Sequence, residues 1–211
     1  MEKMRSELLC RYPCLASVID SIDKAAQMMV DTYKNGGTIL VCGNGGSCAD
    51  SDHIVGELMK GFLSIRPIDE AQRAKMSDAL DDDVLCKLQR GIPAISLPAQ
   101  SAVISAYAND VDPTLVYAQL VFGYGKEQDM LIGLSTSGNS KNVVAAARVA
   151  KAMGLRTLAL TGAKDSKLSE ICDVTVKAPE TETFKVQELH LPIYHYLCAY
   201  IERYLFGADH E

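Results

Sequence analysis

Hydroxyl side chains are concentrated in one short segment that could bind a phosphate group. Ser135, Thr136, Ser137 and Ser140, together with Gly138, lie directly between a predicted strand and a predicted helix. A helix N-terminus offers free backbone N–H groups and the positive end of the helix dipole, so it can hold a phosphate monoester without Lys or Arg. Capping the helix would need only one hydroxyl. Four hydroxyls within six residues therefore favour phosphate binding over capping.

A glycine-rich loop, Gly43 to Ser47, also follows a predicted strand and opens a predicted helix. It begins like the G-x-G-x-x-G fingerprint of dinucleotide-binding proteins, but Cys48 stands where the third glycine would fall. No acidic residue ends a second strand about 20 residues later, and no Walker lysine follows, so the loop argues against a nucleotide cofactor. We interpret it as a second close approach of the backbone to a small ligand. The candidate contacts are Asn44, Gly45, Gly46 and Ser47.

Imidazole and carboxylate side chains recur at helical spacing in two other segments. His53 and Glu57 stand at i and i+4 on the helix that leaves the glycine loop, so they share one face. Such a pair is a metal or acid–base site in a minority of cases and a surface hydrogen bond otherwise. Near the other end of the chain, Gln187, His190 and His195 lie on one predicted helix. On this reasoning alone these histidines remain either ligands or capped, exposed side chains, and the neighbouring tyrosines are core residues.

Composition excludes several classes of protein. The 211 residues carry 21 Lys and Arg against 27 Asp and Glu, a formal net charge of −6, which argues against a nucleic-acid partner. No apolar run approaches the ~20 residues of a membrane helix, and the charged first ten residues do not resemble a signal peptide. Seven scattered cysteines without a C-x-x-C pair indicate reduced thiols. We expect a soluble, cytoplasmic protein.

The elements that must position these residues alternate between strands and helices. Short apolar runs predict strands at 38–42, 94–97, 130–134, 157–160 and 174–176. Helical periodicity predicts helices at 15–34, 47–59, 101–108, 114–124, 140–153, 165–171 and 184–204. This order predicts an α/β fold: a three-layer αβα sandwich around a parallel sheet of about five strands, in a single domain over 1–211. Residues 64–91 predict a helical insertion, and we interpret its Asp81-Asp82-Asp83 as a solvated turn rather than a metal site.

Together these motifs resemble the sugar isomerase (SIS) domain family over about residues 15–206, apart from 64–91. The resemblance is carried by Gly43-Asn44-Gly45-Gly46-Ser47, Ser135-Thr136-Ser137-Gly138-Asn139-Ser140 and Gln187-Glu188-x-His190. The added His53-x-x-x-Glu57 and the pair Gln187 and His195 resemble the sedoheptulose 7-phosphate isomerase (phosphoheptose isomerase) branch. The resemblance implies a flavodoxin-like SIS fold. It also implies homotetramers with sites at subunit interfaces and with the N- and C-terminal helices packed there.

The resemblance also implies roles for individual residues. Phosphate would be held by Ser135, Thr136, Ser137 and Ser140, and the sugar would contact Asn44, Gly45, Gly46, Ser47, Asn109, Asp110, Glu57 and Gln187. Zn²⁺, or another divalent cation such as Mn²⁺ or Fe²⁺, would be bound by His53, Glu57, Gln187 and His195. Glu57 as base and His195 as its partner would interconvert sedoheptulose 7-phosphate and D-glycero-D-manno-heptose 7-phosphate through an enediolate.

Helix geometry adds a hypothesis about this metal site. Gln187 and His195 are eight residues apart, which is about 12 Å along an unbroken helix. Pro192, between them, shortens that distance little even if it kinks the helix. We therefore expect Gln187 and His195 to reach one metal ion from different chains.

The sequence differs from the phosphoheptose isomerase branch at three places, which bear on which sugar is bound more than on the type of reaction. They are the 64–91 segment, Pro192, and Phe184, which stands where many heptose isomerases carry an Asp. The alternative function is a non-catalytic SIS module that binds a phosphosugar or, as one relative does, the replication initiator DnaA. That relative lacks the acid and the last histidine, whereas this chain has Glu57 and His195, so we favour an enzyme.

Overall fold

Five parallel strands form the central sheet of the computed structural model, which describes residues 1–207 and leaves 208–211, the end of the predicted domain, outside. The strand order is β2-β1-β3-β4-β5, and every pairing is parallel. The strands are β1 (Ile39–Gly43), β2 (Ala94–Ser96), β3 (Met130–Leu134), β4 (Arg156–Thr161) and β5 (Val174–Lys177). Every residue of β1 and β3 is buried, as continuous apolar runs predict for a sheet covered on both faces.

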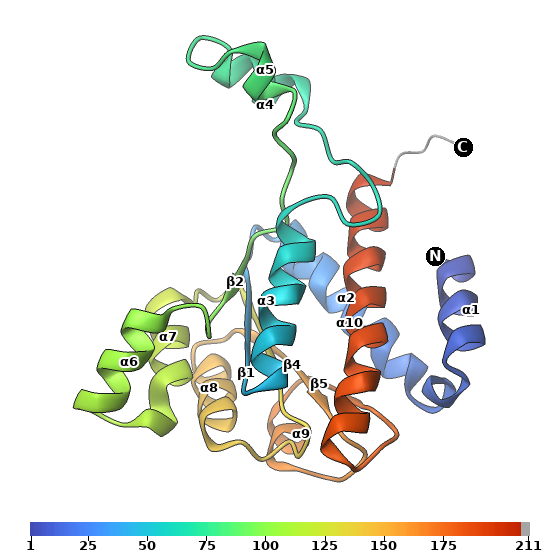
Figure 1. The fold of residues 1–211 in the computed structure, drawn as a ribbon, viewed down its shortest axis with the longest axis vertical. Helices are drawn as coiled ribbons and strands as arrows, with labels where there is room; N and C mark the ends of the chain where they lie inside the picture. The colour runs from blue at the N-terminus through green and yellow to red at the C-terminus, as the bar shows by residue number, and fades with distance from the viewer. Residues whose placement is uncertain (208–211) are drawn as a thin grey trace.

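Helices cover both faces of the sheet, which confirms the predicted α/β class (Figure 1). One face packs against α2 (Ile19–Lys34), α3 (Gly46–Met59) and α10 (Thr183–Phe206). The other packs against α6 (Ser101–Asp110), α7 (Val116–Tyr124), α8 (Lys141–Ala152) and α9 (Lys167–Ile171), with η2 (Pro113–Leu115) before α7. Two apolar cores result, one on each side of the sheet.

The strand order places a ligand-binding crevice between β1 and β3. These strands are neighbours, and the helices that follow them, α3 and α8, lie on opposite faces of the sheet. In open parallel sheets, a ligand binds where the connections diverge in this way, at the carboxyl ends of the strands. The glycine loop and the serine loop therefore emerge side by side at the edge where a ligand is expected.

The N-terminal region differs from the sequence prediction. No helix is predicted before residue 15, but the structure has α1 (Glu2–Arg11), and the predicted helix at 15–34 begins as the 3₁₀ helix η1 (Pro13–Val18). Only Leu8 of α1 is buried, so the segment has no apolar stripe from which periodicity could be detected. Arg5 joins α1 to α2 through a 3.0 Å contact of its Nε with Asp23 Oδ2.

Residues 64–91 extend away from the sandwich beyond the C-terminal end of α3 (Figure 1). They contain the short helices α4 (Glu70–Met76) and α5 (Asp82–Leu85), and an isolated antiparallel bridge joins Pro67 and Gln89 at the base. Asp81 to Asp83, predicted as a solvated turn, are exposed, but they form the N-cap and the first turn of α5. Within residues 1–207, no helix is long and apolar enough to cross a membrane.

A buried ion pair fixes the base of this segment. Arg66 is fully buried, and its Nε donates to Glu202 Oε1 on α10 at 2.7 Å. The Glu202 carboxylate also accepts the backbone N–H groups of residues 62, 63 and 64. Arg66 donates further to the carbonyl oxygens of Leu58 and Glu57, at 2.7 and 3.1 Å. We call Arg66 and Glu202 the clamp, because they hold the end of α3 and the following turn against α10.

Candidate active site

The serine loop after β3 is not used to cap α8. Ser140 is the N-cap residue, yet its own side chain makes no capping hydrogen bond within the described residues, and the Asn142 side chain accepts the Val143 N–H instead. Ser135 Oγ and Ser140 Oγ are instead 2.9 Å apart, so the hydroxyls face one another across the loop. Gly138 has φ +65°, and a Cβ at this position would overlap the Ser166 side chain. The loop is thus a tight turn that places hydroxyls beside a helix N-terminus, an arrangement that suits an anion.

The glycine loop lies against the serine loop's helix and against α10. The Asn44 side chain exchanges two hydrogen bonds with Asn142 on α8, at 2.8 and 2.9 Å. Gly45 has φ +57°, which an L side chain rarely adopts. A Cβ on Gly46 would lie 2.6 Å from Gln187 Nε2. The Gln187 amide thus lies directly against Gly46, which brings this predicted residue beside the two ligand-binding loops.

His53, Glu57 and His195 meet one or two turns further along α3 and α10. His53 Nε2 lies 3.1 Å from Glu57 Oε1 and 3.4 Å from His195 Nε2. Lys60 adds a 2.9 Å ion pair with the other carboxylate oxygen of Glu57. The i, i+4 spacing accounts for the first contact, whereas His195 reaches the pair only because α10 packs beside α3.

Helices α3 and α10 run side by side, and Gln187 contacts α3 at a different level from His195. Gln187 faces Gly46, while His195 faces His53, seven residues further along α3. At 1.5 Å per residue the two contacts are about 10–12 Å apart along the helices. Helix α10 is continuous across Pro192. One chain thus brings His53, Glu57 and His195 together and places Gln187 with the loops.

The donor atoms of this cluster are of the types that suit the divalent cation implied by the family resemblance. Two imidazole nitrogens and a carboxylate oxygen are ligands typical of Zn²⁺. His53 Nε2 lies 3.1 Å from Glu57 Oε1 and 3.4 Å from His195 Nε2. Two ligand atoms of a tetrahedral zinc ion, each bonded at about 2.0–2.1 Å, lie ~3.3 Å apart, so these distances are similar. Among residues 1–207, however, no group of three or more His, Cys, Asp or Glu side chains is arranged to hold a metal ion. The donor types therefore fit the cation, whereas their arrangement within one chain does not by itself form a metal site.

The environment favours an ionised Glu57 and a neutral His195. Partial burial opposes ionisation of Glu57, but the Lys60 ammonium and His53 outweigh it and lower the pKa of the carboxyl. Partial burial lowers the pKa of His195, the neighbouring His53 and Arg11 lower it further, and Glu57 opposes this shift. A carboxylate beside a neutral imidazole can accept a proton from carbon and pass protons onward.

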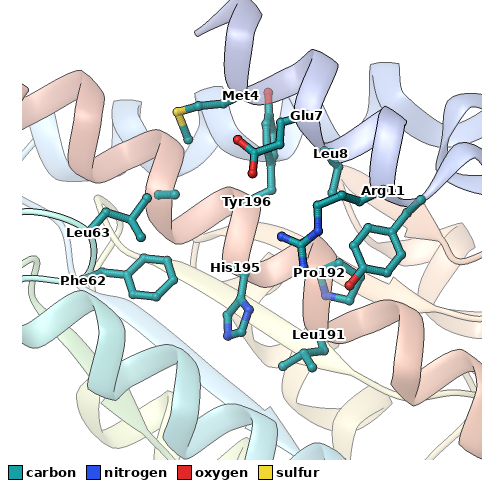
Figure 2. Close-up of a pocket in the computed structure, with 12 residues that line it drawn as sticks. Met4, Glu7, Leu8, Arg11, Phe62, Leu63, Leu191, Pro192, His195 and Tyr196 are labelled. Atoms are coloured by element: carbon teal, nitrogen blue, oxygen red, sulfur yellow. The ribbon is translucent and has the colours of Figure 1, made fainter.

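His195 also borders a pocket of about 370 Å³ between α1, the turn after α3 and α10. Figure 2 shows the His195 ring projecting away from the α1 residues Glu7 and Arg11, with Phe62 beside it. The Phe62 and His195 ring centroids are 5.5 Å apart. The turn held by the clamp thus forms one wall around the imidazole.

The remaining predicted residues lie elsewhere or have other partners. Asn109 and Asp110 are exposed at the end of α6, hydrogen-bonded to one another at 2.8 Å, and within the described chain their side chains form no hydrogen bond with either loop. Phe184 is exposed in the first turn of α10. Sequence reasoning missed Asp50, Lys60 and Tyr194, which contact the cluster. Asp50 was detectable, because at i−3 it shares the face of His53.

His190 is buried between α10 and the sheet. Its Nε2 lies 3.2 Å from the carbonyl oxygen of Thr161 at the end of β4, and within residues 1–207 its Nδ1 has no hydrogen-bond partner. Burial lowers the pKa of His190 to about 4, and the hydrogen bond to Thr161 opposes this only partly. The neutral ring therefore anchors the N-terminal half of α10 rather than binding a ligand.

This histidine makes folding sensitive to acid. In the unfolded chain its pKa is about 6.5, so as pH falls from 6.5 to 4 the unfolded state takes up a proton that the folded state resists. The free energy of unfolding should therefore fall by about 3 kcal/mol more in the wild type than in His190→Gln between pH 7 and pH 4. Urea titrations at both pH values measure this difference. Parallel losses in the two proteins would contradict the assignment.

The fold and the site together define the class of protein. A five-stranded parallel sandwich, with a serine loop and a glycine loop meeting between β1 and β3, is the arrangement that the sequence predicts for a SIS domain. The SIS domain family model matches residues 14–92 and 84–162. The chain belongs to this family.

Comparison with individual proteins narrows the assignment. The chain is 32% identical over 210 residues to the phosphoheptose isomerase of Akkermansia muciniphila, covering 98% of this chain and 99% of the relative. It is 35% identical to that of Helicobacter pylori, covering 90% and 87%. Among solved structures, a phosphoheptose isomerase from Francisella tularensis matches with a TM-score of 0.76 and 27% identity over 96% of this chain and 95% of that chain. Phosphoheptose isomerase GmhA from Neisseria gonorrhoeae gives 0.74 and 27% over 93% and 94%. The chain belongs to the phosphoheptose isomerase family.

Proposed function

We propose that this protein is a phosphosugar aldose–ketose isomerase that interconverts sedoheptulose 7-phosphate and D-glycero-D-manno-heptose 7-phosphate. The observation that carries the proposal is the meeting of Glu57 and His195 at His53 Nε2 in a chain of this family. A binding module needs no base beside an imidazole, whereas isomerisation needs groups that move protons between adjacent carbons.

The residues have separate tasks in this reaction. The serine loop and the N-terminus of α8 bind the phosphate, and the glycine loop and Gln187 bind the sugar beside it. The Glu57 carboxylate takes the proton from C2 of the aldose, and the proton returned at C1 completes the ketose, while the hydroxyl proton passes from O2 to O1. His195 serves as the partner that moves protons. Zn²⁺ bound by His53, Glu57, Gln187 and His195 would supply Lewis-acid stabilisation of the negative oxygens of the enediolate.

The proposal includes a site shared between subunits of a homotetramer. The register of α3 and α10 supports it, because Gln187 and His195 of one chain lie about 12 Å apart along α10. Large apolar side chains support it too, since Leu63, Ile65 and Leu191 are 67%, 80% and 40% exposed around α10 and the turn after α3. A cytoplasmic location is part of the proposal and is supported by seven cysteines in an otherwise ordinary composition.

Metal content and turnover test this function together. The purified protein is analysed for bound metal and incubated with sedoheptulose 7-phosphate, and the products are followed by NMR. We expect a divalent ion, conversion to the aldose, loss of activity after chelation, and recovery on adding Zn²⁺. Five- and six-carbon phosphosugars, run in parallel, establish the preferred substrate. A metal-free protein that binds these phosphosugars without converting them would identify a binding module instead.

A further inference from the structure

Tyr194 links the predicted metal ligand His53 to a second carboxylate. The Tyr194 hydroxyl donates to Asp50 Oδ1 at 3.2 Å and lies 3.0 Å from His53 Nδ1. Asp50 and His53 stand on the same face of α3, and Tyr194 reaches both from α10. Tyr194 is only 2% exposed, so water does not compete freely for its hydroxyl. The three side chains form a line that ends at the His53 ring.

The proton count along this line sets the tautomer of His53. A tyrosine hydroxyl has one proton, and a carboxylate has none to give. When Tyr194 donates to Asp50, its oxygen can only accept from His53, which requires the imidazole proton on Nδ1. The neutral ring then has its lone pair on Nε2, the atom that faces Glu57 and His195. Ring nitrogens that bind metals are commonly selected in this way, through the hydrogen bond made by the other nitrogen.

Ring packing holds Tyr194 in place between Asp50 and His53. The Tyr194 ring packs edge-on against both imidazoles, with centroids 5.4 Å from His53 and 5.0 Å from His195. A phenylalanine would keep these ring contacts and remove only the hydroxyl.

We propose that Asp50 and Tyr194 are positioning residues that hold His53 with its proton on Nδ1, so that Nε2 is presented as a metal ligand. The inference rests on the proposed function, because it concerns the cation bound there. It assigns Tyr194 a polar task in addition to core packing. It also makes His53 part of a chain that spans both helices of the site.

The chain offers a matched control for this proposal. The Tyr196 hydroxyl, on the same helix, also donates to a carboxylate at 3.2 Å, but that carboxylate is Asp23 on α2. Tyr194→Phe and Tyr196→Phe therefore delete equivalent hydrogen bonds, and only the first touches His53. Dissociation constants for Zn²⁺ and Co²⁺ are measured by competition with a chromophoric chelator. We expect Tyr194→Phe to weaken binding by roughly 10–100-fold and Tyr196→Phe to change it by less than about two-fold.

Asp50→Ala extends the test to the whole line. Without its acceptor, the Tyr194 hydroxyl would donate to Nδ1 and move the imidazole proton to Nε2, so this variant should also bind Co²⁺ weakly and alter its visible spectrum. In the Tyr194→Phe background, Asp50→Ala should add little, because the line is already broken. Equal metal affinity in wild type and Tyr194→Phe, or equal losses in both tyrosine variants, would overturn the inference. A wild-type protein that binds neither ion would overturn the proposed metal site and this inference with it.

Discussion

Glu57→Gln is expected to lower kcat by roughly 10²–10⁴-fold, the contribution typical of a positioned general base. The amide keeps the size of the side chain but cannot take a proton from carbon. The lost ion pair with Lys60 lies near the surface, since the Lys60 side chain is 59% exposed, so the free energy of unfolding should change by less than about 1 kcal/mol. The catalytic loss thus exceeds the loss of stability by a wide margin.

Glu188→Gln is the control for this change. Glu188 is exposed on α10 beside Gln187. Glu188→Gln is therefore the same chemical change, made close to the site but away from the His53 cluster. The kcat of both variants is measured with sedoheptulose 7-phosphate, and the midpoint of thermal unfolding is recorded for each. Wild-type turnover in Glu57→Gln would remove Glu57 from the mechanism. Low turnover accompanied by a large fall in the unfolding midpoint would point to a structural role.

The second large effect is expected from mixing two inactive proteins. Gln187→Ala and His195→Ala should each be inactive alone. Suppose that every site takes Gln187 from one subunit and His195 from another. In a random mixture of equal amounts, each of the two subunits has a one-in-two chance of carrying the intact residue, so about one quarter of wild-type activity should return. A site formed by one chain would restore none, since every chain lacks one of the two residues.

The mixing experiment needs proteins that exchange subunits. The variants are co-expressed with different affinity tags, and mixed oligomers are isolated by two successive purifications. Mixing Glu57→Gln with His195→Ala is the control, because these residues meet through His53 within one chain and belong to the same half of the site. Activity in the first mixture and none in the control would support the shared site. Equal activity, or none in either mixture, would contradict it.

The fold could be predicted from the sequence wherever burial leaves a strong pattern. The sheet could be predicted from the apolar runs of β1 and β3. The ligand-binding crevice could be predicted from the glycine and serine loops that follow these strands. Helix α1 could not be predicted in this way, because a helix that buries only Leu8 has almost no apolar periodicity. Pro13 marks the start of η1, where the sequence pattern suggested a continuous α-helix from residue 15.

The candidate site could be predicted only in part. His53 and Glu57 are recognisable because helical spacing alone brings them together. The approach of His195 depends on how α10 packs along α3, which no local pattern specifies. Tyr194 is harder still, because a buried tyrosine on an apolar helix has the pattern of a core residue, and its hydroxyl becomes informative only when Asp50 and His53 are seen on either side.

The clamp has a consequence for how this protein tolerates change in length. Arg66, near the start of the 64–91 segment, binds Glu202 on α10 and the Glu57 carbonyl oxygen, so the base of this segment holds the end of α3 in position. Breaking one partner of a buried ion pair costs about 3–5 kcal/mol, which makes this tether rigid. Evolution or engineering can therefore lengthen, trim or exchange the part of the segment beyond Arg66 as a module, while the reacting groups stay in place.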